Sequence, residues 1–121
     1  MSQIGIRIAV RDLDASRRFY GEALGLPEER PSAFRAGESL ILLEESPDAP
    51  ADAQVQGPGW RYITFQVFKV DEEHAAVLAR GGREALAPIT LGTTARFSMV
   101  RDPDGNWIEL SQRASIVGSL E

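Results

Sequence analysis

The residues best placed for chemistry lie in Trp107-Ile108-Glu109-Leu110, where polar and apolar positions alternate. Successive side chains of a β-strand point to opposite faces, so Trp107 and Glu109 share one face while Ile108 and Leu110 share the other. A carboxylate beside a large aromatic side chain loses hydration, which disfavours its charged form and suits a general base. If any residue of this chain is catalytic, we expect it to be Glu109.

Two other roles for Glu109 stay open. It can form a structural ion pair, for which Arg7 and Arg96 are the candidate partners, or it can contact the polar edge of a ligand. Strand parity places Arg7 on the same face as Glu109, and a neighbouring guanidinium would favour the charged carboxylate. The residue types therefore allow an ion pair, a ligand contact or catalysis at this position.

Large apolar side chains fall on or beside the same predicted face as Glu109. They are Leu42, Trp60, Tyr62, Phe97, Met99 and Trp107. A flat apolar surface of this kind binds aromatic or conjugated molecules by stacking and by the area it buries. We therefore predict a ligand-binding wall made of these residues with Arg7 and Glu109, and we expect Phe34 to add to its rim.

Several common catalytic centres lack matching residues. The chain has no cysteine and a single histidine, His74, so thiolate metal sites and disulfides are excluded. We expect His74 to pack on a helix at the edge of the core. Ser98 and Ser111 are expected to have no histidine to activate them, which argues against a Ser-His-Asp nucleophile. Gly57-Pro58-Gly59 precedes a strand, which is the wrong context for a phosphate-binding loop.

Turn and cap residues define the elements that would position these side chains. The stretch Asp102-Pro103-Asp104-Gly105 predicts a hairpin turn, because Pro103 presets φ at the second position and Gly105 allows a positive φ at the end. Asp12 is the expected N-cap of a first helix, and Gly25 fits the left-handed position after its last turn.

The same signals predict two copies of a strand–helix–strand–strand–strand unit, each roughly fifty residues long. The expected strands are 4–10, 28–30, 33–35 and 39–44, then 62–67, 85–86, 95–100 and 106–111, with a second helix at 72–80 capped by Asp71. This order is typical of the α+β class. We treat 1–121 as one domain, with module one at 1–45, a Pro- and Gly-rich linker at 46–59, module two at 60–113 and a tail at 114–121.

The composition fits an ordinary globular domain. The 121 residues are 43% hydrophobic and 26% charged, enough for one buried core. No stretch approaches the about 20 apolar residues of a membrane span, and the chain does not start like a signal peptide, so we expect a cytoplasmic protein. The net charge of −5 with scattered arginines argues against a nucleic-acid partner and offers no membrane surface.

Two signatures resemble the vicinal oxygen chelate superfamily, which includes glyoxalase I, bleomycin-resistance proteins and extradiol dioxygenases. One is the turn and strand at 102–110, which is similar to that superfamily's closing hairpin. The other is Val10-Arg11-Asp12-Leu13-Asp14-Ala15-Ser16, running into Phe19-Tyr20 and Leu24-Gly25-Leu26. The resemblance spans residues 4–111 and implies two βαβββ modules that form a curved mixed sheet, or cup, with the helices outside.

The resemblance also implies where a metal would bind. The four ligand positions of the superfamily fall on Gly5, Leu42, Tyr62 and Glu109, with Glu44 the nearest carboxylate to Leu42. Of these four residues only Glu109 matches a ligand of that set, and divalent-metal sites of this kind need three or four nitrogen or oxygen donors. We therefore expect neither a bound metal nor another cofactor.

These expectations combine into a metal-free protein of the glyoxalase/bleomycin-resistance type. It would bind or sequester a hydrophobic, aromatic small molecule, as in resistance to a drug or metabolite. The alternative is a glyoxalase- or dioxygenase-like lyase, isomerase or oxygenase that uses Glu109 as base or metal ligand. An open apolar sheet face is normally covered by a partner, so we also predict a homodimer.

Overall fold

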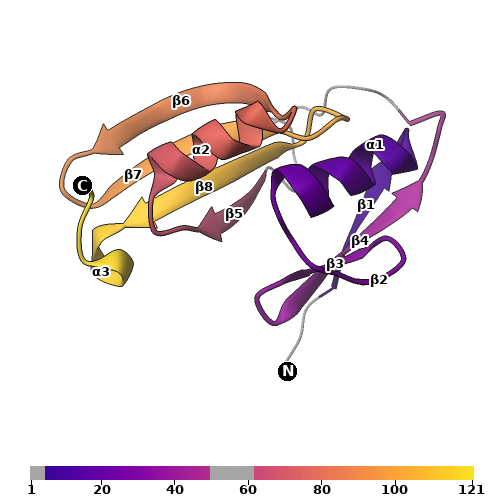
Figure 1. Cartoon of the computed structure of the whole chain (residues 1–121), viewed down its shortest axis with the longest axis horizontal. Helices are drawn as coiled ribbons and strands as arrows, with labels where there is room; N and C mark the ends of the chain where they lie inside the picture. The colour runs from indigo at the N-terminus through magenta and orange to yellow at the C-terminus, as the bar shows by residue number, and fades with distance from the viewer. Residues whose placement is uncertain (1–4, 50–61) are drawn as a thin grey trace.

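A computed structural model describes residues 5–49 and 62–121 (Figure 1). The elements in chain order are β1 (Gly5–Val10), α1 (Leu13–Arg18), the π-helical turn η1 (Phe19–Ala23), β2 (Glu28–Arg30), β3 (Ala33–Ala36), β4 (Ser39–Glu45), β5 (Tyr62–Gln66), α2 (Val70–Ala79), β6 (Arg83–Leu91), β7 (Ala95–Arg101), β8 (Trp107–Arg113) and α3 (Ala114–Val117). Within these ranges, none of the helices has the length and hydropathy that a membrane span requires.

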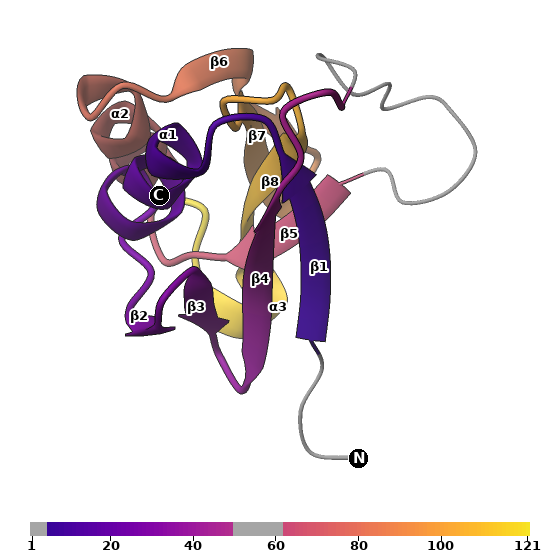
Figure 2. The same cartoon turned by 90° about the vertical axis from the view of Figure 1, so that its right-hand side faces the viewer.

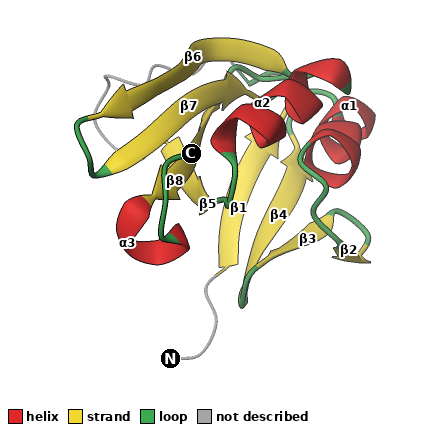
Figure 3. Cartoon of the chain, turned by 60° about the vertical axis from the view of Figure 1, so that its left-hand side comes forward, coloured by secondary structure: helices red, strands yellow, loops and turns green. Residues whose placement is uncertain are grey.

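Each half of the chain builds one four-stranded mixed sheet. The strand orders are β1-β4-β3-β2 and β5-β8-β7-β6. In each module the first strand along the chain pairs in parallel with the fourth, β1 with β4 and β5 with β8. Figures 2 and 3 show α1 and α2 near each other on the same side of the two sheets. The predicted α+β class with two βαβββ modules is confirmed.

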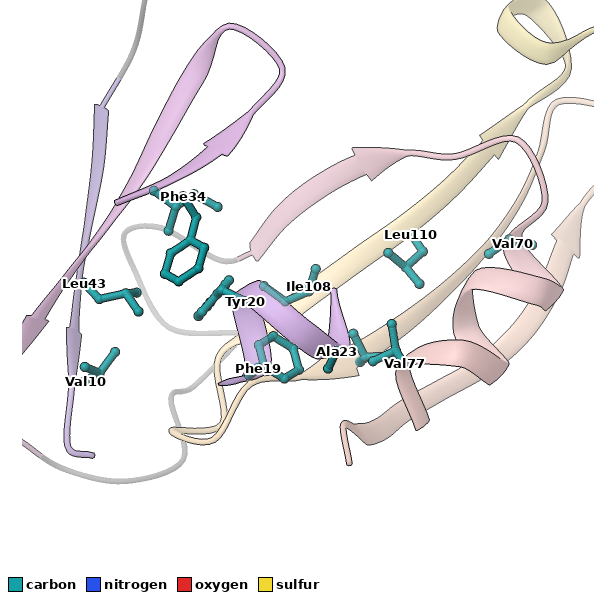
Figure 4. Close-up of a cluster of buried hydrophobic side chains, with 12 residues drawn as sticks. Val10, Phe19, Tyr20, Ala23, Phe34, Leu43, Val70, Val77, Ile108 and Leu110 are labelled. Atoms are coloured by element: carbon teal, nitrogen blue, oxygen red, sulfur yellow. The ribbon is translucent and has the colours of Figure 1, made fainter. Parts of the chain in front are cut away.

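One hydrophobic core runs through both modules. Its buried members are Val10, Phe19, Tyr20, Ala23, Phe34, Ile41, Leu43, Val70, Val77, Val100, Ile108 and Leu110. Figure 4 shows Tyr20 between Phe34 of module one and Ile108 of module two. Because the core takes alternate side chains of each strand, the other side chains point to the opposite side of the sheets, which we call the open face.

The prediction that Phe34 lines the rim of a ligand site is wrong. Phe34 is 1% exposed, and its ring centroid lies 6.3 Å from that of Tyr20. Its partner in the β3–β4 ladder is Ile41, another core residue, so Phe34 points into the core beside Tyr20 and not toward a rim.

The first helix begins and ends as predicted, whereas the second does not begin at the expected cap. The Asp12 carboxylate accepts the N–H of Ala15 at 3.1 Å, and Gly25 adopts a φ of +76°. The N-cap of α2 is Lys69, not Asp71, and the first helical N–H, that of Val70, donates to Gln112 Oε1 at 2.9 Å. A side chain from β8 therefore satisfies the helix end.

Two segments are more ordered than the sequence suggested. The strand predicted at 85–86 extends over the whole of β6, which tolerates Pro88 because β6 is an edge strand and the ladder loses no necessary donor there. The predicted tail contains α3, and Gln112 Nε2 donates to the Ser119 carbonyl oxygen at 3.0 Å, which fixes the chain after α3.

The Asp102–Gly105 turn connects module two to the first helix of module one. Asp102 Oδ2 accepts the hydroxyl of Tyr20 at 2.7 Å, and Asp104 Oδ1 accepts the backbone N–H of Arg11 at 3.0 Å. Both carboxylates are buried. Burial, followed by the nearby Asp102 charge, raises the pKa of Tyr20 well above its ordinary value, so its hydroxyl remains a donor. We call this set of contacts the turn latch.

Candidate functional site

Three rows of side chains cross β7, β8 and β5 on the open face of module two. The rows, read from strand register, are Arg101–Trp107–Tyr62, Met99–Glu109–Thr64 and Phe97–Ser111–Gln66. The residues between them on β8 and β5, such as Ile108 and Phe65, pack on the core side. Neighbouring strands lie about 4.8 Å apart, so side chains within one row are in reach of each other.

The first row contains two aromatic side chains, Trp107 and Tyr62, and the guanidinium of Arg101. The Arg101 guanidinium carbon lies 5.3 Å from the Trp107 ring centroid, within range for a cation–π contact. Tyr62 stands opposite Trp107 in the ladder and is 37% exposed. The indole Nε1 of Trp107 is buried and has no hydrogen-bond partner among the described residues. A buried donor without a partner is uncommon in native proteins, and an acceptor on a ligand would satisfy it.

The second row contains the predicted carboxylate. Glu109 Oε1 accepts the hydroxyl of Thr64 at 2.7 Å, and Met99, opposite Glu109 on β7, is 7% exposed. Thr64 is absent from the predicted wall, although its alternation with Tyr62 places it on the same face and parallel pairing of β5 with β8 brings it to Glu109.

Both predicted ion pairs of Glu109 are wrong. Arg7 pairs with Glu44 on the neighbouring strand, Nη1 to Oε1, at 2.6 Å. Arg96 forms two hydrogen bonds to Asp71, at 2.7 and 2.8 Å. Arg96 alternates with Phe97 and Met99 on β7, so it points to the helix side, where Asp71 in the first turn of α2 meets it.

The predicted wall residues divide between the two modules. Tyr62, Phe97, Met99, Trp107 and Glu109 come together in the three rows of module two. Arg7 and Leu42 face each other on β1 and β4, on the open face of module one. Trp60 lies outside the described residues.

The strand register of the two sheets shows where the four residues at the metal positions lie. Leu42 pairs with Arg7, two residues after Gly5, and Glu109 pairs with Thr64, two residues after Tyr62, so the two modules place these positions equivalently. A Cβ added to Gly5 would lie 3.5 Å from Leu42 Cδ1, which confirms that Gly5 and Leu42 are neighbours.

A divalent metal does not fit this set of side chains. Glycine and leucine offer no donor atom, Glu44 is engaged by Arg7, and one carboxylate with one phenol falls short of three donors. Across 5–49 and 62–121, no three His, Cys, Asp or Glu side chains are grouped as a metal site would need.

His74 lies on the helix side, 4% exposed, as the prediction for a core-edge histidine stated. The prediction that Ser98 lacks a histidine partner is wrong: His74 Nδ1 lies 2.8 Å from Ser98 Oγ, and His74 Nε2 lies 2.7 Å from Glu84 Oε2. Ser98 is 0% exposed, so its hydroxyl cannot meet a substrate. The three side chains instead hold α2 against β6 and β7.

Comparison with known proteins adds the family context. The family model described as Glyoxalase/Bleomycin resistance protein/Dioxygenase superfamily matches residues 3–110. A probable lactoylglutathione lyase of Vibrio parahaemolyticus is 30% identical over 94% of this chain and 92% of the relative. A probable lactoylglutathione lyase of Synechocystis sp. is also 30% identical, over 89% of this chain and 92% of the relative.

Solved structures share the architecture. The crystal structure of a glyoxalase/dioxygenase from Nostoc punctiforme matches with a TM-score of 0.72 and 25% identity. The match covers 90% of this chain and 88% of that chain. The similarity therefore extends over both modules.

Proposed function

Since the chain belongs to the Glyoxalase/Bleomycin resistance protein/Dioxygenase superfamily, we propose that it is a metal-independent member that binds a hydrophobic, aromatic small molecule on its open face. The observation that carries this proposal is the first row of the wall, in which Trp107 stands opposite Tyr62. Tyr62 is itself one of the four metal positions, and Trp107 lies two residues from Glu109, another of them. Such a protein would sequester its ligand, as in resistance to a drug or metabolite.

Polar groups in the wall give the proposed ligand an orientation. The unpartnered indole N–H of Trp107 offers a donor, and Glu109 offers an acceptor held in place by Thr64. Binding sites for small molecules commonly combine an apolar lining with a few fixed polar groups. A planar molecule with an acceptor at one edge and a donor at another matches this arrangement.

We predict that the purified protein binds no divalent metal tightly. Elemental analysis after dialysis should give zinc, nickel, iron and manganese far below one ion per chain, because three of the four positions lack a ligand of the required kind. Near-stoichiometric metal would contradict the prediction. A triple variant, Gly5→His, Leu42→Glu and Tyr62→His, restores three donors and serves as the positive control for the analysis.

A second candidate function is a lyase reaction, favoured by the two relatives named probable lactoylglutathione lyase. Glu109 would then act as general base, since it is the only carboxylate in the three rows. Formation of lactoylglutathione by the purified protein, with and without added zinc or nickel, separates the two candidates. Turnover that disappears in Glu109→Gln would replace the binding proposal with the enzymatic one.

We also propose that the chain is a homodimer. Large apolar side chains on the strands remain exposed, among them Ile6 at 36%, Ile89 at 44% and Leu91 at 62%. Ile89 and Leu91 pair with Phe97 and Ala95, so they lie together on the open face of the edge strand β6. An exposed apolar edge of this kind is normally covered by a partner, and a second copy is the commonest one. Sedimentation at micromolar concentration should give a dimer, and a monomer under those conditions would refute this proposal.

A further inference from the structure

A hollow lies on the helix side of the molecule, where the two modules meet. It measures about 310 Å³ and is bounded by α1 and η1 on one side and by the end of α2 and the start of β6 on the other. Figure 3 shows α1 and α2 close together on this side. We propose that this hollow binds a small anionic molecule, one that carries a phosphate or carboxylate group next to a short apolar part.

Arginines from separate elements converge on the hollow. Arg18 comes from α1, Arg80 from the end of α2, Arg83 from β6 and Arg101 from the end of β7, where it also contacts the Trp107 ring. Through their guanidinium groups, Arg18 and Arg80 form no ion pair or hydrogen bond with any described residue. Arg83 Nη2 donates to the Asp102 carbonyl oxygen at 3.2 Å, which anchors the third guanidinium beside the turn latch.

The concentration of arginine here stands out against the charge of the chain. The net charge is −5, and several surface arginines elsewhere pair with carboxylates, as in Arg7–Glu44, Arg17–Glu28 and Arg96–Asp71. The acidic residues lining the hollow are Glu22 and Asp102, and the Asp102 carboxylate is buried in the turn latch. Glu22 alone opposes the guanidiniums, so the hollow favours an anion.

The floor of the hollow is apolar. Phe19 and Ala23 line it and are 5% and 2% exposed. The guanidinium group matches phosphate and carboxylate oxygens with two parallel hydrogen bonds. A ligand with an anionic head and a small ring would therefore place the head between Arg18 and Arg80 and the ring over Phe19. Because it touches both modules, it would also hold them together.

Calorimetric titration with phenyl phosphate tests this proposal, with inorganic phosphate, benzoate and benzyl alcohol as comparison probes. We expect phenyl phosphate to bind more tightly than inorganic phosphate, and benzyl alcohol not to bind. Comparing the affinity for benzoate with that for phenyl phosphate shows whether the hollow prefers a carboxylate or a phosphate. Arg18→Gln and Arg80→Gln should each weaken binding about tenfold, the usual loss for one charge-assisted contact. Phenyl phosphate should raise the melting temperature of the wild type but not of the double variant Arg18→Gln, Arg80→Gln.

The control is the double variant Arg30→Gln, Arg113→Gln, which removes the same charge from exposed positions outside the hollow. It should bind phenyl phosphate as the wild type does. Equal losses in both double variants would show non-specific attraction and overturn the proposal, as would undiminished binding in Arg18→Gln, Arg80→Gln. Loss of phenyl phosphate binding in Tyr62→Ala, which removes an open-face ring that does not line the hollow, would place the molecule on the open face, which also overturns it.

Discussion

Replacing Asp102 with alanine is expected to lower the free energy of unfolding by about 3 kcal/mol, because it leaves several buried donors without an acceptor. Asp102 is 0% exposed. Its Oδ1 accepts the backbone N–H groups of Asp104 at 3.0 Å and Asn106 at 2.8 Å. Its Oδ2 accepts the Tyr20 hydroxyl at 2.7 Å and the Asn106 side-chain amide at 2.8 Å.

Two kinds of structure depend on this one carboxylate. The bonds to Asp104 and Asn106 shape the turn between β7 and β8, in which Gly105 has a φ of +84°. The bond to Tyr20 joins the turn to η1 of module one. An alanine at 102 would therefore loosen the hairpin and the packing of the modules together, which makes its effect larger than that of a typical surface substitution.

Urea denaturation followed by circular dichroism measures the loss. Tyr20→Phe is the matched variant, since it keeps the ring and removes only the hydroxyl bond to Asp102; it should cost about 1 kcal/mol. Asp48→Ala, at an exposed position, should change the free energy of unfolding by less than about 0.5 kcal/mol. If Asp102→Ala proved no more costly than Asp48→Ala, the turn latch would not stabilise the fold.

The stability difference between wild type and Asp102→Ala should also depend on pH in a defined direction. Burial raises the pKa of Asp102, and this effect outweighs the hydrogen bonds from Asn106 and Tyr20, which lower it. A carboxyl group whose pKa is raised by folding adds stability that is fully present below the unfolded pKa of 3.8 and is lost as the pH rises through the folded pKa. The stability difference between wild type and Asp102→Ala should therefore be largest in acid and decrease toward neutral pH.

The local signals of the sequence account for most of the fold. Alternation, Asp12 as N-cap, Gly25 after the helix and the Asp102–Gly105 turn are short-range features, and the structure confirms each of them. They were sufficient to predict two βαβββ modules because turn or cap residues separate most of the elements from one another.

Features set by contacts between distant segments were not predictable in the same way. Asp71 looked like a cap, but the long-range bond from Val70 to Gln112 and the pairing of Asp71 with Arg96 determine the start of α2. The polar turn sequence around Asp102 gave no sign that its carboxylate is buried against the Tyr20 hydroxyl. An aspartate that only shapes a turn looks the same in the sequence as one that also bonds another module. Only the packing of the two modules shows that Asp102 does both.

In the candidate site, too, short-range patterns predicted some features and long-range contacts determined the others. Parity along β8 and β5 was enough to place Tyr62, Trp107 and Glu109 on one face. It was insufficient to choose the partners of Glu109, because the parallel register of β5 with β8 decides that Thr64, and neither Arg7 nor Arg96, reaches the carboxylate.

The largest effect on ligand binding is expected from Trp107→Ala. If an aromatic ligand stacks on the first row of the wall, truncation of this side chain should cost about 2 kcal/mol or more of binding free energy, which is roughly a thirtyfold weaker Kd. The loss combines the buried ring area with the indole N–H, whose missing acceptor the ligand would supply. Tyr62→Ala should weaken binding less, since Tyr62 lies more exposed at the edge strand.

Calorimetric titration against a panel of planar aromatic compounds measures these losses without relying on tryptophan fluorescence, which Trp107→Ala would itself change. Phe68→Ala is the matched control, because Phe68 is an aromatic residue that is 79% exposed and lies outside the three rows. A compound that binds wild type and Phe68→Ala equally but loses affinity for Trp107→Ala would locate the ligand on the wall. Unchanged affinity in both Trp107→Ala and Tyr62→Ala would place the binding site elsewhere, because no ligand can stack on side chains that are absent.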